Sequence, residues 1–173
     1  MRIIAATIAT ALLATPLAHA QPPSAAPVPE TMPYDIPYGT PITLETAQKA
    51  IAAAEAEARR HNWKMSISVV DPAGNLVALI TMDGTQYGSI AIAQAKARTA
   101  ALFRRPSGAY QAAVNTGSPS ALSALPFNGA IAIEGGFPIV VDGKLIGAIG
   151  SSGGIPTQDS VTAKAGLAAL GVH

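Results

Sequence analysis

Residues 133–150 read IEGGFPIVVDGKLIGAIG, and this stretch decides the fold class. Two short apolar runs flank Asp142-Gly143, a pair that tolerates the positive φ angles of both central residues in a type I′ turn. The stretch therefore predicts a tight antiparallel hairpin. A segment with helical character follows it, and antiparallel sheet followed by one amphipathic helix excludes most parallel, nucleotide-binding architectures.

The remaining elements predict an α+β domain. Apolar residues at three- and four-residue spacing, capped by Thr43, predict a helix that runs to about His61. Turn residues separate two β-rich runs, and a loop-rich stretch separates a second helix from the hairpin. The predicted fold is a five-stranded antiparallel sheet packed with helices, of the profilin-like or PAS-like type. The other predicted elements are strands at 65–71, 75–82 and 130–133, a helix at 90–103 capped by Ser89, and a last helix from the cap Thr157 to about Leu170.

The first part of the chain predicts export. Residues 1–20 have the positive start, apolar run and small-x-small ending of a secretory signal peptide. Residues 21–41 hold seven of the fourteen prolines and predict an extended arm, whose end Tyr34, Ile36 and Tyr38 would pin to the body. Residues 42–173 then form a single domain. We expect a periplasmic or secreted bacterial protein.

Charge and composition exclude several classes of partner. Removing Arg2 with the signal peptide leaves ten basic residues of eleven against ten acidic ones. This balance argues against nucleic acid as a partner and against membrane insertion after cleavage. The absence of cysteine excludes disulfides and thiolate ligands. Much of the apolar content is alanine, which buries little area per side chain, so we expect a homo-oligomer.

Few residues offer metal-binding or acid/base chemistry. His61 and Met82 are the candidate metal ligands, because the other histidines lie in the signal peptide and at the last position. Asp83 and Glu134 stand where strands are predicted to end, so either one is a candidate general acid or base, or else a turn-forming or solvated side chain. Sequence leaves both interpretations open.

A basic cluster lies in and after the second predicted helix. It contains Lys96, Arg98, Arg104 and Arg105. Such a cluster is a solvated helix face and terminus, or it holds a carboxylate through forked hydrogen bonds.

Several separated blocks resemble one family. They are residues 71–78, 82–84, 95–107, 135–143 and 165–170. Together they resemble the GlcG/HbpS family of haem-binding, haem-degrading-type domains, and a similar domain lies at the C-terminus of PduO-type corrinoid adenosyltransferases. The resemblance extends from about Thr40 to His173.

The resemblance implies a compact domain with a central antiparallel sheet, usually oligomeric, that binds haem or a related ligand. Many relatives have His, a plausible axial ligand, where this chain has Asn75. Asn is a poor iron ligand. Bound haem would then depend on His61 or Met82, on a neighbouring chain, or on apolar contact and propionate pairing alone.

Three hypotheses for function follow. The first is an exported module that binds haem or a small hydrophobic anion. Haem is the candidate cofactor. The second is an enzyme that uses Asp83 or Glu134 on a hydroxy or oxo acid or an aromatic substrate. The third is a sensory or structural oligomer that partners a membrane receptor. The candidate ligand-binding residues are Met82, Lys96, Arg98, Phe103, Arg104, Gly135, Gly136 and Phe137.

Overall fold

The computed structural model describes residues 27–124 and 129–172. The chain divides into two units, residues 1–31 and 32–173. In the first unit, residues 27–31 are exposed and belong to no helix or strand, and the predicted signal peptide lies outside the described residues. None of the described helices is long and apolar enough to cross a bilayer.

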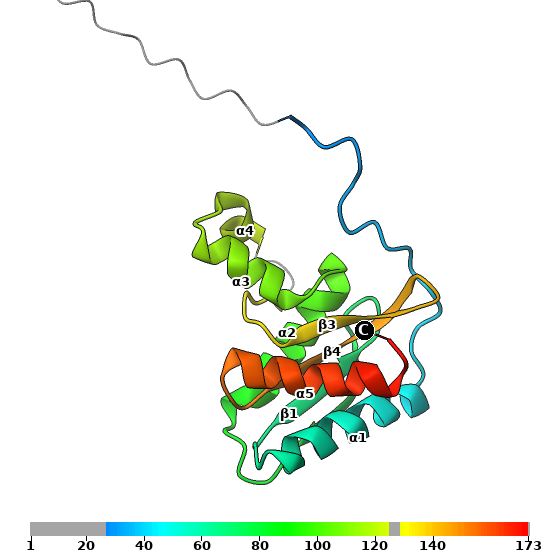
Figure 1. Cartoon of the computed structure of the whole chain (residues 1–173), viewed down its shortest axis with the longest axis vertical. Helices are drawn as coiled ribbons and strands as arrows, with labels where there is room; N and C mark the ends of the chain where they lie inside the picture. Colours follow the sequence, from blue (N-terminus) through cyan, green and yellow to red (C-terminus); the bar gives the residue numbers. More distant parts are fainter. Residues whose placement is uncertain (1–26, 125–128, 173) are drawn as a thin grey trace, which may run out of the picture. The chain divides into compact units, whose positions relative to one another are not determined.

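The second unit contains the folded domain (Figure 1). Its described part has four strands and five helices, and the helices lie on both sides of the sheet. In chain order they are α1 (Leu44–Arg60), β1 (Ser66–Val70), β2 (Leu76–Thr81), α2 (Gly88–Phe103), α3 (Ser107–Asn115), α4 (Pro119–Ala124), β3 (Gly136–Val141), β4 (Lys144–Ser152) and α5 (Pro156–Ala169).

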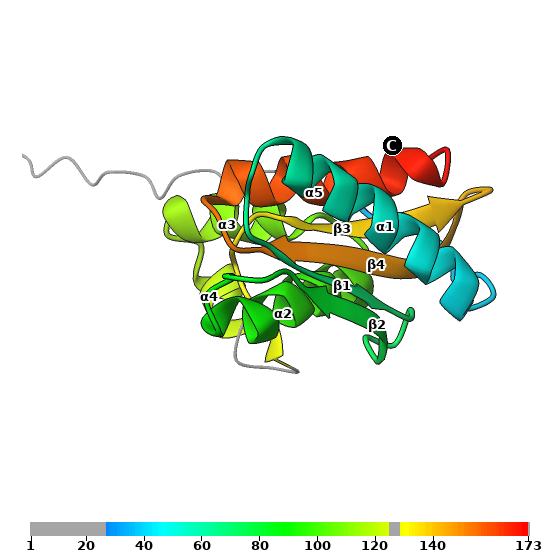
Figure 2. The same cartoon turned by 90° about the horizontal axis from the view of Figure 1, so that it is seen from below.

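The sheet has the order β2-β1-β4-β3, and all neighbouring strands are antiparallel. Helices α1 and α5 cover one face and α2 covers the other, as Figure 2 shows. The predicted α+β class with an antiparallel sheet is confirmed. Among the described residues, this order makes β3 and β2 the two terminal strands, so each has one side without a neighbouring strand there.

The hairpin predicted from residues 133–150 is present as β3 and β4. Asp142 and Gly143 form its turn, with φ angles of 49° and 72°. Both angles are positive, as a type I′ turn requires.

The prediction of five strands is wrong, because residues 130–133 form no strand. The backbone there bonds to side chains of α2 and α3: the Ile131 amide donates to Thr99 Oγ1 at 2.8 Å, and the Ile133 carbonyl accepts from Ser107 Oγ at 2.6 Å. Buried backbone groups need partners, and these two found them outside the sheet. An apolar run alone does not say which kind of partner its backbone will have.

Helix starts were predicted with mixed success. Thr43 caps α1, accepting a hydrogen bond from the Thr46 amide at 3.2 Å. Ser89 does not cap α2, because the helix already starts at Gly88 and the Ser89 side chain is buried. The last helix starts at Pro156, just before Thr157, because the fixed φ of proline suits the first helical position.

Helix α2 packs unusually close to the hairpin. A Cβ added to Gly150 of β4 would overlap the Ala93 carbonyl oxygen, and a Cβ added to Gly136 of β3 would overlap the Lys96 carbonyl oxygen. The helix presents buried alanines at this contact, among them Ala97. Glycine on the strands and alanine on the helix thus bring the two backbones together, which accounts for part of the small-residue composition.

We predict that Gly150→Ala destabilises the domain by about 1–3 kcal/mol, because the added methyl forces α2 away from the sheet. Urea unfolding followed by circular dichroism measures the change. Gly88→Ala is the matched control: nothing lies within 4 Å of its Cβ position, so this variant should be neutral or slightly stabilising. Equal stability of Gly150→Ala and the native chain would contradict the close packing.

Candidate functional site

A cleft of about 580 Å³ lies beside the terminal strand β3. We call it the β3 cleft. Its volume is within the range of small-molecule sites. It is lined by Tyr34, Ile36, Arg104, Pro106, Phe137, Pro138, Val140, Lys164, Leu167 and Val172.

The walls of the β3 cleft are mostly apolar. Phe137, Pro138 and Val140 come from β3, and Leu167 comes from α5. Proline has no N–H for a ladder, so Pro138 is tolerated because β3 is a terminal strand. The same proline discourages another strand from pairing there, which leaves this side of the sheet available for a ligand.

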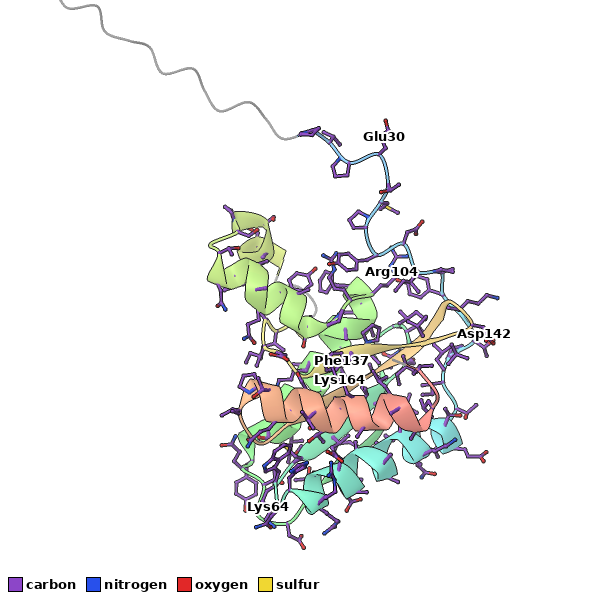
Figure 3. All side chains as sticks on the ribbon, in the orientation of Figure 1. Glu30, Lys64, Arg104, Phe137, Asp142 and Lys164 are labelled. Carbon is purple, nitrogen blue, oxygen red and sulfur yellow. The ribbon has the colours of Figure 1, made fainter. Side chains whose placement is uncertain are left out.

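Two cations line the β3 cleft from different elements. The Lys164 ammonium, on α5, lies 5.2 Å from the centroid of the Phe137 ring, and Figure 3 shows the two side chains together. Arg104 follows the last residue of α2 in a left-handed conformation with φ of 53°. Its Nη1 donates to the Ile36 carbonyl at 3.0 Å and lies 3.5 Å from an Asp35 carboxylate oxygen. The cleft therefore combines apolar walls with positive charge.

A second cleft of about 390 Å³ lies at the start of β2 and against α2. Arg98 and Gln94 give it a more polar lining, and Asn75 contributes from the β1–β2 turn. The Asn75 side chain is already engaged, because its Nδ2 donates to Asp71 Oδ2 at 2.9 Å. Arg98 and Arg104, predicted as one basic cluster, thus line two different clefts.

Lys96 lies inside the protein. Its ammonium donates to Asp159 Oδ2 at 2.6 Å and to the Ser151 carbonyl at 3.1 Å. The two side chains are only 1% and 3% exposed. Burial lowers the pKa of Lys96 and raises the pKa of Asp159, while their mutual hydrogen bond and charges act in the opposite direction. Lys96 therefore joins α2 to the start of α5, and it lines neither cleft described above.

Gly135 and Gly136 leave room for this buried pair and for the close contact with α2. Gly135 has φ of +119°, and a Cβ there would lie 2.8 Å from Asp159 Cβ and 3.0 Å from Lys96 Nζ. Both glycines are buried. They bring β3 up to α2 and lead directly into Phe137, so they set the position of the β3 cleft without lining it.

The two candidate catalytic carboxylates lie in different surroundings. Asp83 is exposed in the turn after β2. Glu134 is half-buried, and its Oε1 accepts a hydrogen bond from Ser160 Oγ at 2.7 Å. Its backbone amide donates to Gln111 Oε1 at 2.7 Å. Neither carboxylate lines the β3 cleft.

The other candidates do not line the β3 cleft either. Met82 is buried in the main core, and Phe103 packs on Tyr110 with ring centroids 4.8 Å apart. His61 stacks on Trp63 at 4.3 Å between centroids, and its Nε2 lies 3.0 Å from a Glu57 oxygen. Within the described part of the chain, no three His, Cys, Asp or Glu side chains gather as a metal site.

Of the predicted ligand residues, the structure thus brings Arg104 and Phe137 together at the β3 cleft. Sequence reasoning missed Lys164 and Leu167, which face the cleft from α5. A signal was available, because Lys164 is the one basic residue in α5 and stands three positions before Leu167, on the same helix face. Tyr34 and Ile36 were predicted to pin the arm to the body, and their contribution to a cleft was not foreseen.

Comparisons with known proteins agree on one family. The model of the family described as "Haem degrading protein HbpS-like" matches residues 42–168. Protein GlcG of Escherichia coli K12 is 43% identical over 111 residues, 64% of this chain and 81% of GlcG. A double mutant of Streptomyces reticuli HbpS superposes with a TM-score of 0.71 at 30% identity, covering 86% of this chain and 99% of that one. The PduOC:haem complex has a TM-score of 0.71 at 25% identity, covering 78% and 98%.

We predict that Lys96→Met destabilises the domain by about 3–5 kcal/mol, because it leaves the buried Asp159 carboxyl without its cation and with a hydrogen bond from the Gly154 amide. The double variant Lys96→Met/Asp159→Leu should recover part of this loss, since it removes the buried carboxyl but also the acceptor of the Gly154 amide. Urea unfolding measures both. Arg59→Met is the matched control: it removes one partner of an exposed pair with Glu55 and should cost less than about 1 kcal/mol. A Lys96→Met chain as stable as the control would contradict this assignment.

Proposed function

We propose, because this chain belongs to the family of haem-degrading HbpS-like proteins, that it binds haem or a similar planar, hydrophobic anion in the β3 cleft. One observation carries the proposal: apolar residues of β3 and α5 line the cleft together with two cations, Arg104 and Lys164. Haem has the matching chemistry, a flat apolar ring with two propionates. Haem in the PduOC structure supports the ligand class.

The two cations are suited to different parts of this task. The guanidinium of Arg104 is planar and carries five N–H donors, so it can pair with a carboxylate while Nη1 still donates to the Ile36 carbonyl. The Lys164 ammonium lies over the Phe137 ring and acts as a point charge at the apolar wall. The ring of the ligand would pack on Phe137 and Leu167, and its carboxylates would pair with these cations.

The described lining of the β3 cleft suits the ring and propionates of haem. Among the residues that the structure describes there, none is His, Cys or Met. Asn75, at the position where the resemblance places His, lines the second cleft and bonds to Asp71. We therefore propose that packing and ion pairing by these described residues hold the ligand, without a bond from histidine, cysteine or methionine among them to the iron.

The rest of the proposal rests on sequence. Residues 1–20 support export to the periplasm or beyond, and the alanine-rich composition supports assembly into a homo-oligomer. Acid/base catalysis by Asp83 or Glu134 gains no support from the β3 cleft, because neither side chain lines it.

We predict that hemin added to the purified protein shifts the Soret band, and that Arg104→Ala and Lys164→Ala each weaken binding roughly tenfold or more. A charge-assisted hydrogen bond contributes about 1.5–3 kcal/mol, and every 1.4 kcal/mol is a factor of ten in Kd. Absorbance titration measures the Kd.

Arg98→Ala is the matched control, because Arg98 is on the same helix but lines the second cleft. Its Kd should equal that of the native chain. Tenfold weakening by Arg98→Ala with none by Arg104→Ala would move the site to the second cleft. The absence of any Soret shift at micromolar hemin would contradict haem binding altogether.

We also predict that neither His61→Ala nor Asn75→His changes the Soret maximum of the complex, because neither position lines the β3 cleft. Absorbance spectra of the ferric and ferrous forms measure this. Binding of an imidazole to the iron changes the Soret and visible bands of the complex. A changed spectrum in His61→Ala would identify His61 as a ligand, and a new imidazole-type spectrum in Asn75→His would place the iron in the second cleft.

A further inference from the structure

Part of the β3 cleft comes from outside the region that defines the family. The family match covers residues 42–168, whereas Tyr34 and Ile36 line the cleft from the arm. These residues belong to the same unit as the domain. The end of the arm, from Tyr34 on, is therefore part of the site. We call residues 34–38 the strap.

The backbone of the arm is fixed to β4 at the C-terminal end of the strap. The Leu145 amide donates to the Pro37 carbonyl, and the Gly39 amide donates to the Leu145 carbonyl, both at 2.8 Å. This edge of β4 is available because the pairing of β1 with β4 ends at Val70 and Ala148. The arm thus continues the sheet where β1 stops, and Figure 1 shows it running past the hairpin into α1.

Side-chain contacts fix both ends of the strap. The Arg105 guanidinium carbon lies 4.1 Å from the centroid of the Tyr34 ring and 5.2 Å from that of Tyr110. The Arg104 guanidinium carbon lies 5.6 Å from the Tyr38 ring. Two adjacent arginines therefore hold two tyrosines of the arm by cation–π contacts, each worth about 0.5–2 kcal/mol.

The backbone at Tyr34 is in an uncommon conformation. Its φ is 60°, in the left-handed region, and the Ile36 amide donates to the Tyr34 carbonyl at 2.9 Å across a tight turn. A residue with a side chain adopts this region at some cost and needs its surroundings to keep it there. The Arg105 contact supplies that support, and the turn directs the Ile36 carbonyl to Arg104.

We infer that the strap is a specificity-determining part of the ligand site, one that adds a flat wall at Tyr34 and presents Arg104 to an anion. This inference rests on the proposed function. The flat wall at Tyr34 and the charge of Arg104 together favour a ligand that is planar, aromatic and anionic. The Ile36 carbonyl and the Asp35 carboxylate occupy one side of the guanidinium, so they orient its other donors and leave those for the ligand. Arg105 acts as a positioning residue, because it holds Tyr34 but does not line the cleft.

The decisive variant is Arg105→Ala, titrated with hemin. It leaves every lining residue of the β3 cleft unchanged, so a purely local site would keep its Kd. We expect binding about three- to tenfold weaker, the effect of losing a cation–π contact of about 1 kcal/mol. Tyr34→Ala should weaken binding at least as much, and Tyr34→Phe should keep the native Kd because the ring is retained.

Arg59→Ala controls for the loss of an exposed arginine elsewhere, on α1, and should bind hemin as the native chain does. Hydrogen exchange followed by mass spectrometry gives a second readout: hemin should slow exchange at the Gly39 and Leu145 amides in the native chain and less so in Arg105→Ala. Urea midpoints of the variants show that the domain remains folded.

The outcomes separate this inference from the proposed function. In one outcome, Arg105→Ala and Tyr34→Ala bind hemin with the native Kd while Arg104→Ala binds it more weakly. This result would overturn the role inferred for the strap and leave the proposed ligand site in place. A native chain that binds no hemin would overturn the proposed function and the strap with it.

Discussion

The close contact between α2 and the β3–β4 hairpin is the constraint on which the rest of the domain depends. It requires glycine at positions 136 and 150, because any Cβ there would meet the backbone of the helix. Because α2 lies so close to the sheet, the Lys96 side chain is buried, and Asp159 neutralises its charge there. The same contact places Arg104, at the end of α2, beside the terminal strand. One backbone contact thus determines both the buried pair and the charged end of the β3 cleft.

Elements governed by local chemistry could be predicted from the sequence. The Asp142-Gly143 turn and the Thr43 cap depend on residues within a few positions, and both are present. The strand expected at residues 130–133 depended instead on which groups would meet its backbone. Thr99 and Ser107 supplied those bonds from other elements, and nothing in a short apolar run reveals such partners.

Only part of the site could be predicted, because its residues also come from elements that are distant in the sequence. Arg104 and Phe137 stand out in sequence, but the residues that complete the β3 cleft come from both ends of the chain, Tyr34 and Lys164 among them. A run of basic residues says nothing about which of them is buried. Lys96, Arg98 and Arg104 appear as one cluster along the chain, yet one is interior and the other two line separate clefts.

The described lining of the β3 cleft contains no imidazole, so under the proposed function its affinity comes from buried area and charge. Burying apolar surface contributes about 25 cal/mol per Å², so a planar ring gains most when both of its faces are covered. Phe137 and Leu167 cover one side from the domain, and the strap brings Tyr34 to the cleft from the arm. Ion pairs at a partly exposed cleft are weakened by salt, unlike a bond to iron. Under the proposed function, such a site binds its ligand reversibly, and the contacts of the strap contribute to the affinity.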